Sequence, residues 1–520
     1  MEKLCRTNDV FFVNKLYKYY DLKILIYTTL LLLYSYGFKI FNASISIDSE
    51  IALLYVTPYD WINDGRFGTA LLLYLLNFSP FNPYVSNLLS GLFLFIAAFL
   101  TNWIYHADEN DERDNKFDYI FIGLFVTTPS LAELFNFCTF NFTVMAGMAL
   151  ISLGVYFAVY DNTKKSVCIS VLCLTFSLGI YQSLVTVYVG MILSFILYKN
   201  RYETLFKSLK ILFASLVLYK VVDKVLHPTA SSYINGFVYW GKYSTIDILN
   251  AQLAFVRRLA LGEIYPLSFL LLLAMLACCI YGLKIIFCSK VNPQPYSTII
   301  SLSIVILFLL SPFYFNIFFG SILPVRSNVV IPLYVSFSAI LILKLLKDIK
   351  ARYASLVCVS FICCCGWLIF MQASKVSYMM YGEVLKSTNE YIVAHKLGMQ
   401  IEAIEKDYDN KLPVVFLGKR DNNIPKSILY RGEVIGSGFF NWYEPGRINI
   451  YLRTIGYDYP TGSVSDYEYA VEHKNDIPVW PQDNSIVKMN DMIIVRFSDS
   501  VDEVKKISPR VNEFNHIMKE

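Results

Sequence analysis

Apolar runs long enough to cross a membrane recur along residues 22–372, and they restrict the chain to one class of fold. A helix needs about 20 mostly apolar residues to span the ~30 Å hydrocarbon core of a bilayer. Only 17% of the residues are charged, whereas a soluble domain has about a quarter. The chain is therefore predicted to be a polytopic α-helical membrane protein.

About ten or eleven spans are predicted. The run over 166–198 is too long for one span, so it is divided near Tyr181. The stretch 66–79 is too short to span and is closed by Pro80 and Pro83, so it is predicted to be a re-entrant or interfacial helix. The other spans are expected near 22–41, 82–106, 118–134, 141–160, 206–226, 264–287, 296–317, 328–346 and 353–372.

Lysine and arginine are distributed unevenly between the two sets of connections, and the richer set is expected in the cytoplasm. The N-terminus then lies in the cytoplasm, as a retained tail and not a cleaved signal peptide. The first loop, 42–80, and the region after 372 face outward. The richer set consists of Lys164, Lys165, Lys199, Arg201, Lys207, Lys210, Lys284, Lys290, Lys344, Lys347, Lys350 and Arg352.

Residues 373–520 are predicted to form a soluble α/β domain, separate from the transmembrane module at 1–372. Residues 375–408 have a helical pattern, whereas 412–418 and 448–456 have strand patterns. Residues 485–497 are predicted to form a hairpin with Asn490–Asp491 in its turn.

The hydrophilic segments that could carry chemistry all face outward, where nucleotide cofactors are not generally present. The cytoplasmic connections are short, and none contains a glycine-rich phosphate loop or a dinucleotide fingerprint. An enzyme that acts on the outer side needs a substrate activated in another way, and a sugar carried on a polyprenyl phosphate meets that need. Transfer requires a carboxylate to accept the acceptor's proton and a cation, best an arginine, to hold the phosphate. No cofactor is predicted, and the sequence contains no evident cluster of metal ligands.

The first outward loop contains YDWINDGRFG, in which Asp60 and Asp64 are the candidates for the base. On one helical turn these two acids would share a face. Asp60 can equally act as a capping acid, with Pro58 at the first helical position and Gly65 as the C-terminal stop. The choice between Asp60 and Asp64 therefore stays open.

Other polar residues near the outer face have both a functional and a structural interpretation. Arg326 lies at the mouth of a late span, where it can bind a phosphate or snorkel. Glu133 lies near the outer end of the third span, where an ionisable residue indicates a function. Trp442 can stack on a sugar ring or belong to a core. The remaining candidates for a substrate cavity are Tyr181 and Gln182, at the helical break, and Arg257 and Arg258, in an amphipathic stretch expected at the lipid headgroups.

Taken in order along the chain, these motifs resemble the phage-type serotype-converting glucosyltransferases. The resemblance rests on DxxxDGR at 60–66, IYQ at 180–182, PxR at 324–326 and the C-terminal VWPQDNSIVKMNDMIIVRF. It implies a C-type glycosyltransferase fold in a bacterial inner membrane. The implied reaction moves glucose from undecaprenyl-phosphate-glucose to O-antigen repeats of lipopolysaccharide in the periplasm. The resemblance also implies that Asp60 and Asp64 are the catalytic group and that Arg66 and Arg326 lie near the donor phosphate.

Other functions share the compartment or the lipid carrier. A lipid-linked oligosaccharide flippase or transporter would show internal symmetry and charges near mid-membrane, and the sequence has little of either. An O-antigen polymerase usually lacks a terminal soluble domain, and a membrane-anchored binding module would not need so many spans. The sequence favours a glycosyltransferase whose partners are a lipid-linked donor, an O-antigen acceptor and membrane lipid, with no nucleic acid.

Overall fold

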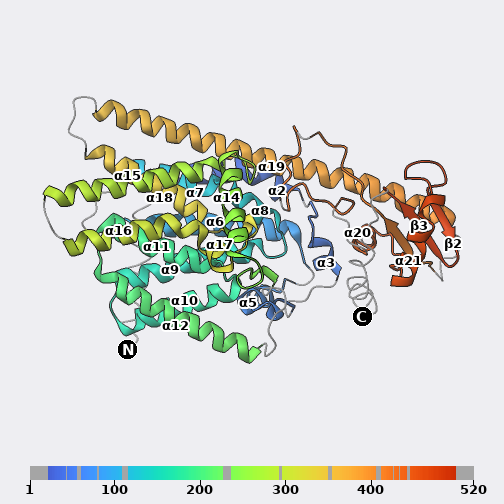
Figure 1. Ribbon diagram of the computed structural model, residues 1–520, viewed down its shortest axis with the longest axis horizontal. Coiled ribbons are helices and arrows are strands. Elements are labelled where there is room, and N and C mark those ends of the chain that lie inside the picture. The colour runs from blue at the N-terminus through green and yellow to red at the C-terminus, as the bar shows by residue number, and fades with distance from the viewer. Residues whose placement is uncertain are drawn as a thin grey trace.

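The structure is a computed structural model, which describes residues 22–42, 44–54, 60–78, 81–107, 115–226, 236–291, 295–348, 354–405, 411–425, 427–432, 434–441 and 446–498. Over these residues the chain is mostly helical, with one small sheet. Most of the long helices run along the long axis of the molecule, and the sheet lies at one end of that axis (Figure 1).

Six helical segments of the described chain are long and apolar enough to cross a membrane, which is consistent with a polytopic membrane protein. The count rises to seven if α7 (Asn115–Thr127) and α8 (Ser130–Asn136), which meet at a bend of 52°, form one broken span. The six segments are α2 (Leu22–Phe41), α6 (Pro83–Ile104), α9 (Asn141–Tyr160), Phe269–Phe287 of α15 (Phe269–Val291), Thr298–Phe319, and Ser355–Ile404 of α19 (Ala354–Ile404). The segment Thr298–Phe319 contains most of α16 (Pro295–Leu310), then η1 (Ser311–Phe313) and α17 (Tyr314–Phe319).

The other predicted spans are also helices, although they do not reach the same length and apolarity. α10 (Lys164–Ile180), α11 (Leu184–Lys199) and α18 (Ile331–Lys347) have 17, 16 and 17 residues. α12 (Glu203–Leu226) is longer but carries several charges. The predicted division of 166–198 is confirmed, because α10 ends and α11 begins on either side of Tyr181. The total of ten or eleven spans stays a prediction.

α9 lies between α6 and α10 in the helical bundle and contacts both. The hydroxyl of Ser152 on α9 is hydrogen-bonded to that of Thr101 on α6 at 2.8 Å. On the other side, the Ser170 hydroxyl of α10 donates to the carbonyl oxygen of Gly154 at 2.8 Å. Small residues let helices approach this closely in a membrane, where packing and hydrogen bonds hold them together.

Five further elements lie between the long helices: α3 (Ser49–Leu54), α4 (Asp60–Asn63), α5 (Phe67–Leu75), α14 (Thr245–Ala260) and η2 (Val325–Ser327). Asp60 is on α4, Asp64 and Arg66 lie between α4 and α5, Arg257 and Arg258 are on α14, and Arg326 is on η2. α5 is the short helix predicted within 66–79. It lies against the end of α10, where the Thr69 hydroxyl donates to the carbonyl oxygen of Ile180 at 3.1 Å. A Cβ on Gly68 would come within 2.7 Å of the Phe176 carbonyl oxygen, so this close approach requires glycine.

The C-terminal part of the chain contains a three-stranded sheet of order β1-β3-β2. β2 (Ile486–Met489) and β3 (Met492–Arg496) form the predicted antiparallel hairpin, with Asn490 at a φ of 50° in its turn. β1 (Val414–Leu417) is the other predicted strand and pairs in parallel with β3. α21 (Val464–Glu472), which is followed by η3 (Lys474–Asp476), contacts β1.

The strand predicted at 448–456 is wrong, because these residues form most of a helix, α20 (Arg447–Thr454). Every residue from Arg447 to Leu452 is buried. The segment is therefore buried on all sides. The spacing of its apolar residues then does not show which side faces the core, so it does not distinguish a helix from a strand. The helix predicted at 375–408 is confirmed, but it is the continuation of the last span. α19 is one helix of 51 residues, about 76 Å long, and it reaches from the bundle to the sheet (Figure 1).

Candidate active site

Asp64 lies in a tight turn between α4 and α5. The backbone N–H of Arg66 donates to the Trp61 carbonyl oxygen at 2.9 Å, and Gly65 has a φ of 70°. A side chain at Gly65 would be strained, and its Cβ would lie 2.8 Å from the Tyr219 hydroxyl of α12. The glycine therefore lets the turn pack directly against α12 and fixes the direction of the Asp64 side chain.

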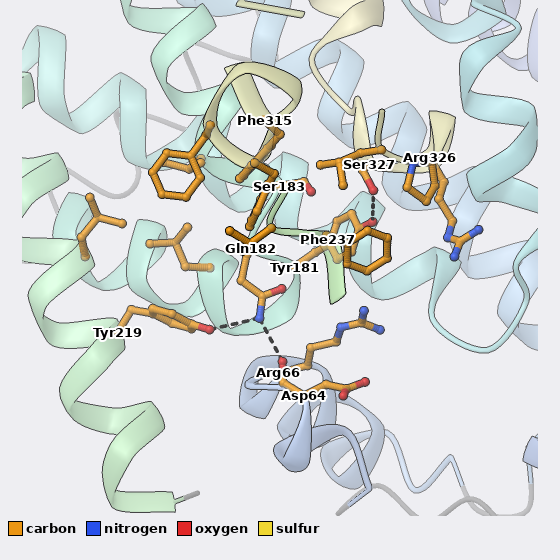
Figure 2. Close-up of a pocket in the computed structure, with 18 of the residues that line it drawn as sticks. Asp64, Arg66, Tyr181, Gln182, Ser183, Tyr219, Phe237, Phe315, Arg326 and Ser327 are labelled. Atoms are coloured by element: carbon orange, nitrogen blue, oxygen red, sulfur yellow. Dashed lines mark hydrogen bonds between the residues drawn. The ribbon is translucent and has the colours of Figure 1, made fainter. Parts of the chain in front are cut away.

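The break between α10 and α11 holds this turn in place. Gln182, in the break, donates through Nε2 to the Asp64 carbonyl oxygen and to the Tyr219 hydroxyl, both at 3.0 Å (Figure 2). The Tyr219 hydroxyl in turn donates to the Gly65 carbonyl oxygen at 3.3 Å. Three segments that are distant in the sequence are thus joined by side chain to backbone hydrogen bonds.

Two arginines lie over a group of aromatic rings beside the turn. The guanidinium carbon of Arg66 is 5.0 Å from the centre of the Phe140 ring and 5.4 Å from that of Tyr181. The guanidinium carbon of Arg326 is 5.1 Å from the centre of the Phe137 ring. The Phe137 and Phe140 rings are themselves in contact, with their centres 4.7 Å apart. We call these two rings the aromatic floor.

The guanidinium group of Arg66 keeps unused hydrogen-bonding capacity. Its Nε is buried and has no hydrogen-bond partner among the described residues, and no ion pair of Arg66 is present there. Contact with the faces of aromatic rings stabilises the guanidinium cation and does not use its N–H donors, which lie in the plane of the guanidinium group. Arg66 can therefore still donate hydrogen bonds to an anion in the cavity.

A cavity of about 510 Å³ brings five of the predicted site residues together: Asp64, Arg66, Tyr181, Gln182 and Arg326. Figure 2 shows Asp64 and Arg66 on one side of this cavity and Arg326 and Ser327 on the other. The Tyr181 hydroxyl is hydrogen-bonded to that of Ser327 at 3.1 Å, which ties η2 to the helical break. The rest of the lining is mostly apolar and comes from Leu178, Ser183, Val185, Leu216, Tyr219, Lys220, Phe237, Val238, Phe315, Phe318, Phe319, Leu323 and Pro324.

The apolar part of the cavity reaches exposed surface. Phe318 on α17 and Leu216 on α12 line the cavity, and they are also 72% and 39% exposed. In a membrane-spanning protein, such apolar exposed side chains face hydrocarbon. The cavity is therefore amphipathic, with charged groups on one part of its wall and a rim of exposed apolar side chains on another.

The other predicted site residues lie outside this cavity. Asp60 is the first residue of α4 and is exposed. Arg257 and Arg258 are in the last turn of α14, and Arg258 is paired with Glu263 at 3.7 Å. Glu133 is buried in α8, where its carboxylate accepts the backbone N–H groups of Val434 and Ile435. Trp442 lies outside the described residues.

Several of the lining residues belong to no motif that could be recognised in the sequence. Tyr219 and Lys220 lie near the end of the span predicted at 206–226, and Phe237 lies within the hydrophilic stretch 227–262. The only available hint was the aromatic run FYFNIFF at 313–319, which supplies Phe315, Phe318 and Phe319. Among the described residues, no group of three or more histidine, cysteine, aspartate or glutamate side chains is arranged to hold a metal ion.

A polytopic helical chain with an amphipathic cavity, a carboxylate and two arginines has the features of a membrane glycosyltransferase. The family model described as Glucosyl transferase GtrII matches residues 37–343. The match covers more than half of the chain, so the protein belongs to this family and is a glucosyltransferase. The predicted family is thereby confirmed. Every residue that lines the cavity lies within the matched region. No curated protein and no solved structure matches the chain.

Proposed function

We propose that the protein transfers glucose from a polyprenyl-phosphate-linked donor, of the undecaprenyl-phosphate type, to O-antigen repeats of lipopolysaccharide at the periplasmic face of the bacterial inner membrane. One observation carries the proposal. A single cavity joins an apolar wall with an exposed rim to a wall bearing Asp64, Arg66 and Arg326. A lipid-linked sugar phosphate has the same division between an apolar chain and a charged head.

Arg66 and Arg326 are proposed to hold the donor phosphate. An arginine fork matches phosphate geometry and stays charged at any pH of interest. The two side chains come from segments 260 residues apart yet line one cavity, and the aromatic floor supports both guanidinium groups. The polyprenyl chain would leave the cavity past Leu216 and Phe318, toward the lipid.

Asp64 is proposed to be the catalytic base. It would accept the proton of the acceptor hydroxyl while that oxygen forms a bond to the anomeric carbon. The bond between the anomeric carbon and the phosphate oxygen breaks, and its electron pair leaves with the lipid phosphate beside the arginines. This single displacement inverts the anomeric centre. Asp60 is instead proposed to stabilise the N-terminus of α4, because a negative charge in the first turn of a helix interacts favourably with the positive end of the helix dipole.

The orientation is proposed from the distribution of lysine and arginine. The lysine-rich connections include those after α15 and α18, and α19 starts at that end of the bundle and runs toward the sheet (Figure 1). The positive-inside rule places that end in the cytoplasm. The C-terminal sheet is then periplasmic.

The proposal is tested by sugar transfer in membranes supplied with radiolabelled polyprenyl-phosphate-glucose and O-antigen acceptor. Loss of a positioned general base lowers the rate by about 10²–10⁴-fold. We therefore expect Asp64→Asn to lose transfer to that extent and the matched Asp60→Asn to stay within about threefold of wild type. Full transfer by Asp64→Asn would exclude it as the base. No transfer by well-folded wild-type protein would exclude this donor and acceptor.

A further inference from the structure

A segment of the C-terminal region is part of the core of the membrane bundle. We call residues 427–432 and 434–441 the strap. Its Val434 and Ile435 are buried in the same hydrophobic cluster as side chains from the long helices. The Tyr430 hydroxyl donates to the carbonyl oxygen of Ile264 at 2.8 Å, before α15. The strap lies beyond residue 343, where the family match ends.

Glu133 on α8 binds the backbone of the strap. One carboxylate oxygen, Oε2, accepts the N–H groups of Val434 at 2.9 Å and Ile435 at 3.1 Å. Glu133 is completely buried, so these hydrogen bonds are made away from water, where they are strong. A Cβ at Gly432 would lie 1.6 Å from the other carboxylate oxygen, so the strap reaches Glu133 only because residue 432 is glycine.

A second buried acid holds the strap from a different helix. Glu383 on α19 accepts the N–H of Gly436 at 2.9 Å and is paired with Lys386. Lys386 donates to the carbonyl oxygen of Ser437 at 2.5 Å. Buried carboxylates on two different helices therefore hold the strap, Glu133 on α8 and Glu383 on α19, and these two can be removed separately.

The anchor on α8 leads directly to the two arginines. α8 ends at Asn136 and is followed by Phe137, whose ring lies under Arg326. Phe137 contacts Phe140, whose ring lies under Arg66. α8 also contacts η2, which carries Arg326. A shift of α8 would therefore move the aromatic floor and both guanidinium groups. α19 also contacts α8, but Glu383 on α19 binds the strap at Gly436 and not at the end of α8 that carries the floor.

We propose that Glu133 is a positioning residue, which seats the strap on α8 and thereby fixes the aromatic floor under the arginines that hold the donor phosphate. The inference rests on the proposed function for the identity of that ligand. It assigns the C-terminal region a part in donor binding. Glu133 acts through α8 and touches neither donor nor acceptor.

The test uses the full-length protein in nanodiscs, with undecaprenyl phosphate as the binding probe. Removing a buried acceptor leaves its two donors unpaired, which changes a binding constant by roughly five- to 150-fold if the whole cost is felt at the site. We expect Glu133→Ala to raise the Kd for undecaprenyl phosphate and the KM for the donor about tenfold, with kcat nearly unchanged. Glu133→Gln, which keeps one acceptor oxygen, should have a smaller effect.

Two further variants distinguish a positioning role of Glu133 from a general loss of folded protein. Gly432→Ala keeps Glu133 but forces the strap away, and it should raise KM as Glu133→Ala does. Glu383→Gln loosens the strap on α19 only and should leave KM unchanged even where it lowers the melting temperature. Equal KM for all variants, or an equal rise for Glu383→Gln and Glu133→Ala, would overturn the proposal.

A measurement without ligand keeps this inference independent of the proposed reaction. Amide hydrogen exchange in segments 134–141 and 325–328 should become faster in Glu133→Ala and Gly432→Ala but not in Glu383→Gln. If wild type does not bind undecaprenyl phosphate, the proposed donor is wrong, while the exchange pattern still decides the role of Glu133. Unchanged exchange in both segments would show that the strap does not position the floor.

Discussion

Arg66 and Arg326 are both cations, but the surroundings of Arg66 depend on the flat shape of its guanidinium group. Arg66 lies among Trp61, Phe140 and Tyr181, with its guanidinium carbon 5.0–5.4 Å from the three ring centres. A lysine would keep the charge, but it lacks the planar fork that stacks on rings and binds phosphate through two N–H groups. The contribution of Arg66 to phosphate binding should therefore be lost when lysine replaces it, even though the positive charge is kept.

We expect Arg66→Lys to raise the KM for the polyprenyl-phosphate donor about tenfold, or ~1.4 kcal/mol, with a smaller change in kcat. Transfer assays at varied donor concentration in membranes check this. Arg257→Lys is the matched control, because Arg257 is on α14 and outside the cavity. Wild-type KM in Arg66→Lys would show that only charge is needed at this position.

Among the elements, α14 has apolar side chains on two faces. Ile248, Phe255 and Leu259 are buried against the protein. A second row is exposed at a helical spacing of three and four residues: Ile246, Leu249, Leu253 and Val256, at 70, 55, 68 and 40%. α14 runs across the direction of the long helices (Figure 1), and its last turn carries Arg257 and Arg258. These features are typical of a helix lying in the membrane interface.

A photo-crosslinking amino acid placed at Leu253 should therefore label phospholipid in native membranes. The same amino acid at Lys488, which is exposed on β2 of the C-terminal sheet, should not label lipid. Labelling would be measured by mass spectrometry of the purified protein. If position 253 reacts with water and not with lipid, α14 does not lie in the interface.

Sequence patterns predicted the elements that depend on local composition. The long helices, the division near Tyr181 and the hairpin at Asn490 follow from apolar runs and turn residues. The helix α20 was missed because Arg447–Leu452 is buried on all sides, which removes the period that distinguishes a helix from a strand.

The site was predicted only in part. The sequence indicated individual residues of the site but not which residues they contact in space. Asp64, Arg66 and Arg326 stood out as charges beside apolar segments, yet nothing local shows that residues 64 and 326 line one cavity. Glu133 was expected to line a substrate cavity. Its hydrogen-bond partners, Val434 and Ile435, are 301 and 302 residues away, and contacts of that range leave no pattern in one sequence.

On the scale of the whole molecule, the C-terminal region is joined to the loop between α2 and α6 as well as to the bundle. Arg447 of α20 forms ion pairs with Asp48 at 2.6 Å and Glu50 at 2.5 Å. Both acids precede the turn that carries Asp64. The chain therefore folds back so that its C-terminal region contacts the loop that supplies the proposed base, and the strength of this contact bears on the site.

This contact should depend on pH in a defined direction. Burial raises the pKa of the Glu50 carboxyl from 4.5 to about 7, although Arg447 lowers it. The folded protein then holds a proton on Glu50 that the unfolded chain has lost. The contribution of Glu50 to the free energy of unfolding is full below pH 4.5 and is lost as the pH rises through about 7. The loss amounts to about 3 kcal/mol.

The thermal unfolding midpoint of purified wild-type protein should therefore fall, relative to that of Glu50→Gln, as the pH rises from about 5 to about 7, and the difference should be constant above about pH 8. Comparison with this variant cancels the other titrating groups, because both proteins share them. Asp48→Asn removes the second acid on Arg447 but leaves Glu50 buried, so it should keep a fall of the same sign, made smaller because Asp48 also raises the pKa of Glu50. A midpoint of wild type that stays constant relative to that of Glu50→Gln from about pH 5 to about 7 would mean that Glu50 is ionised in the folded protein throughout this range, held in that form by Arg447.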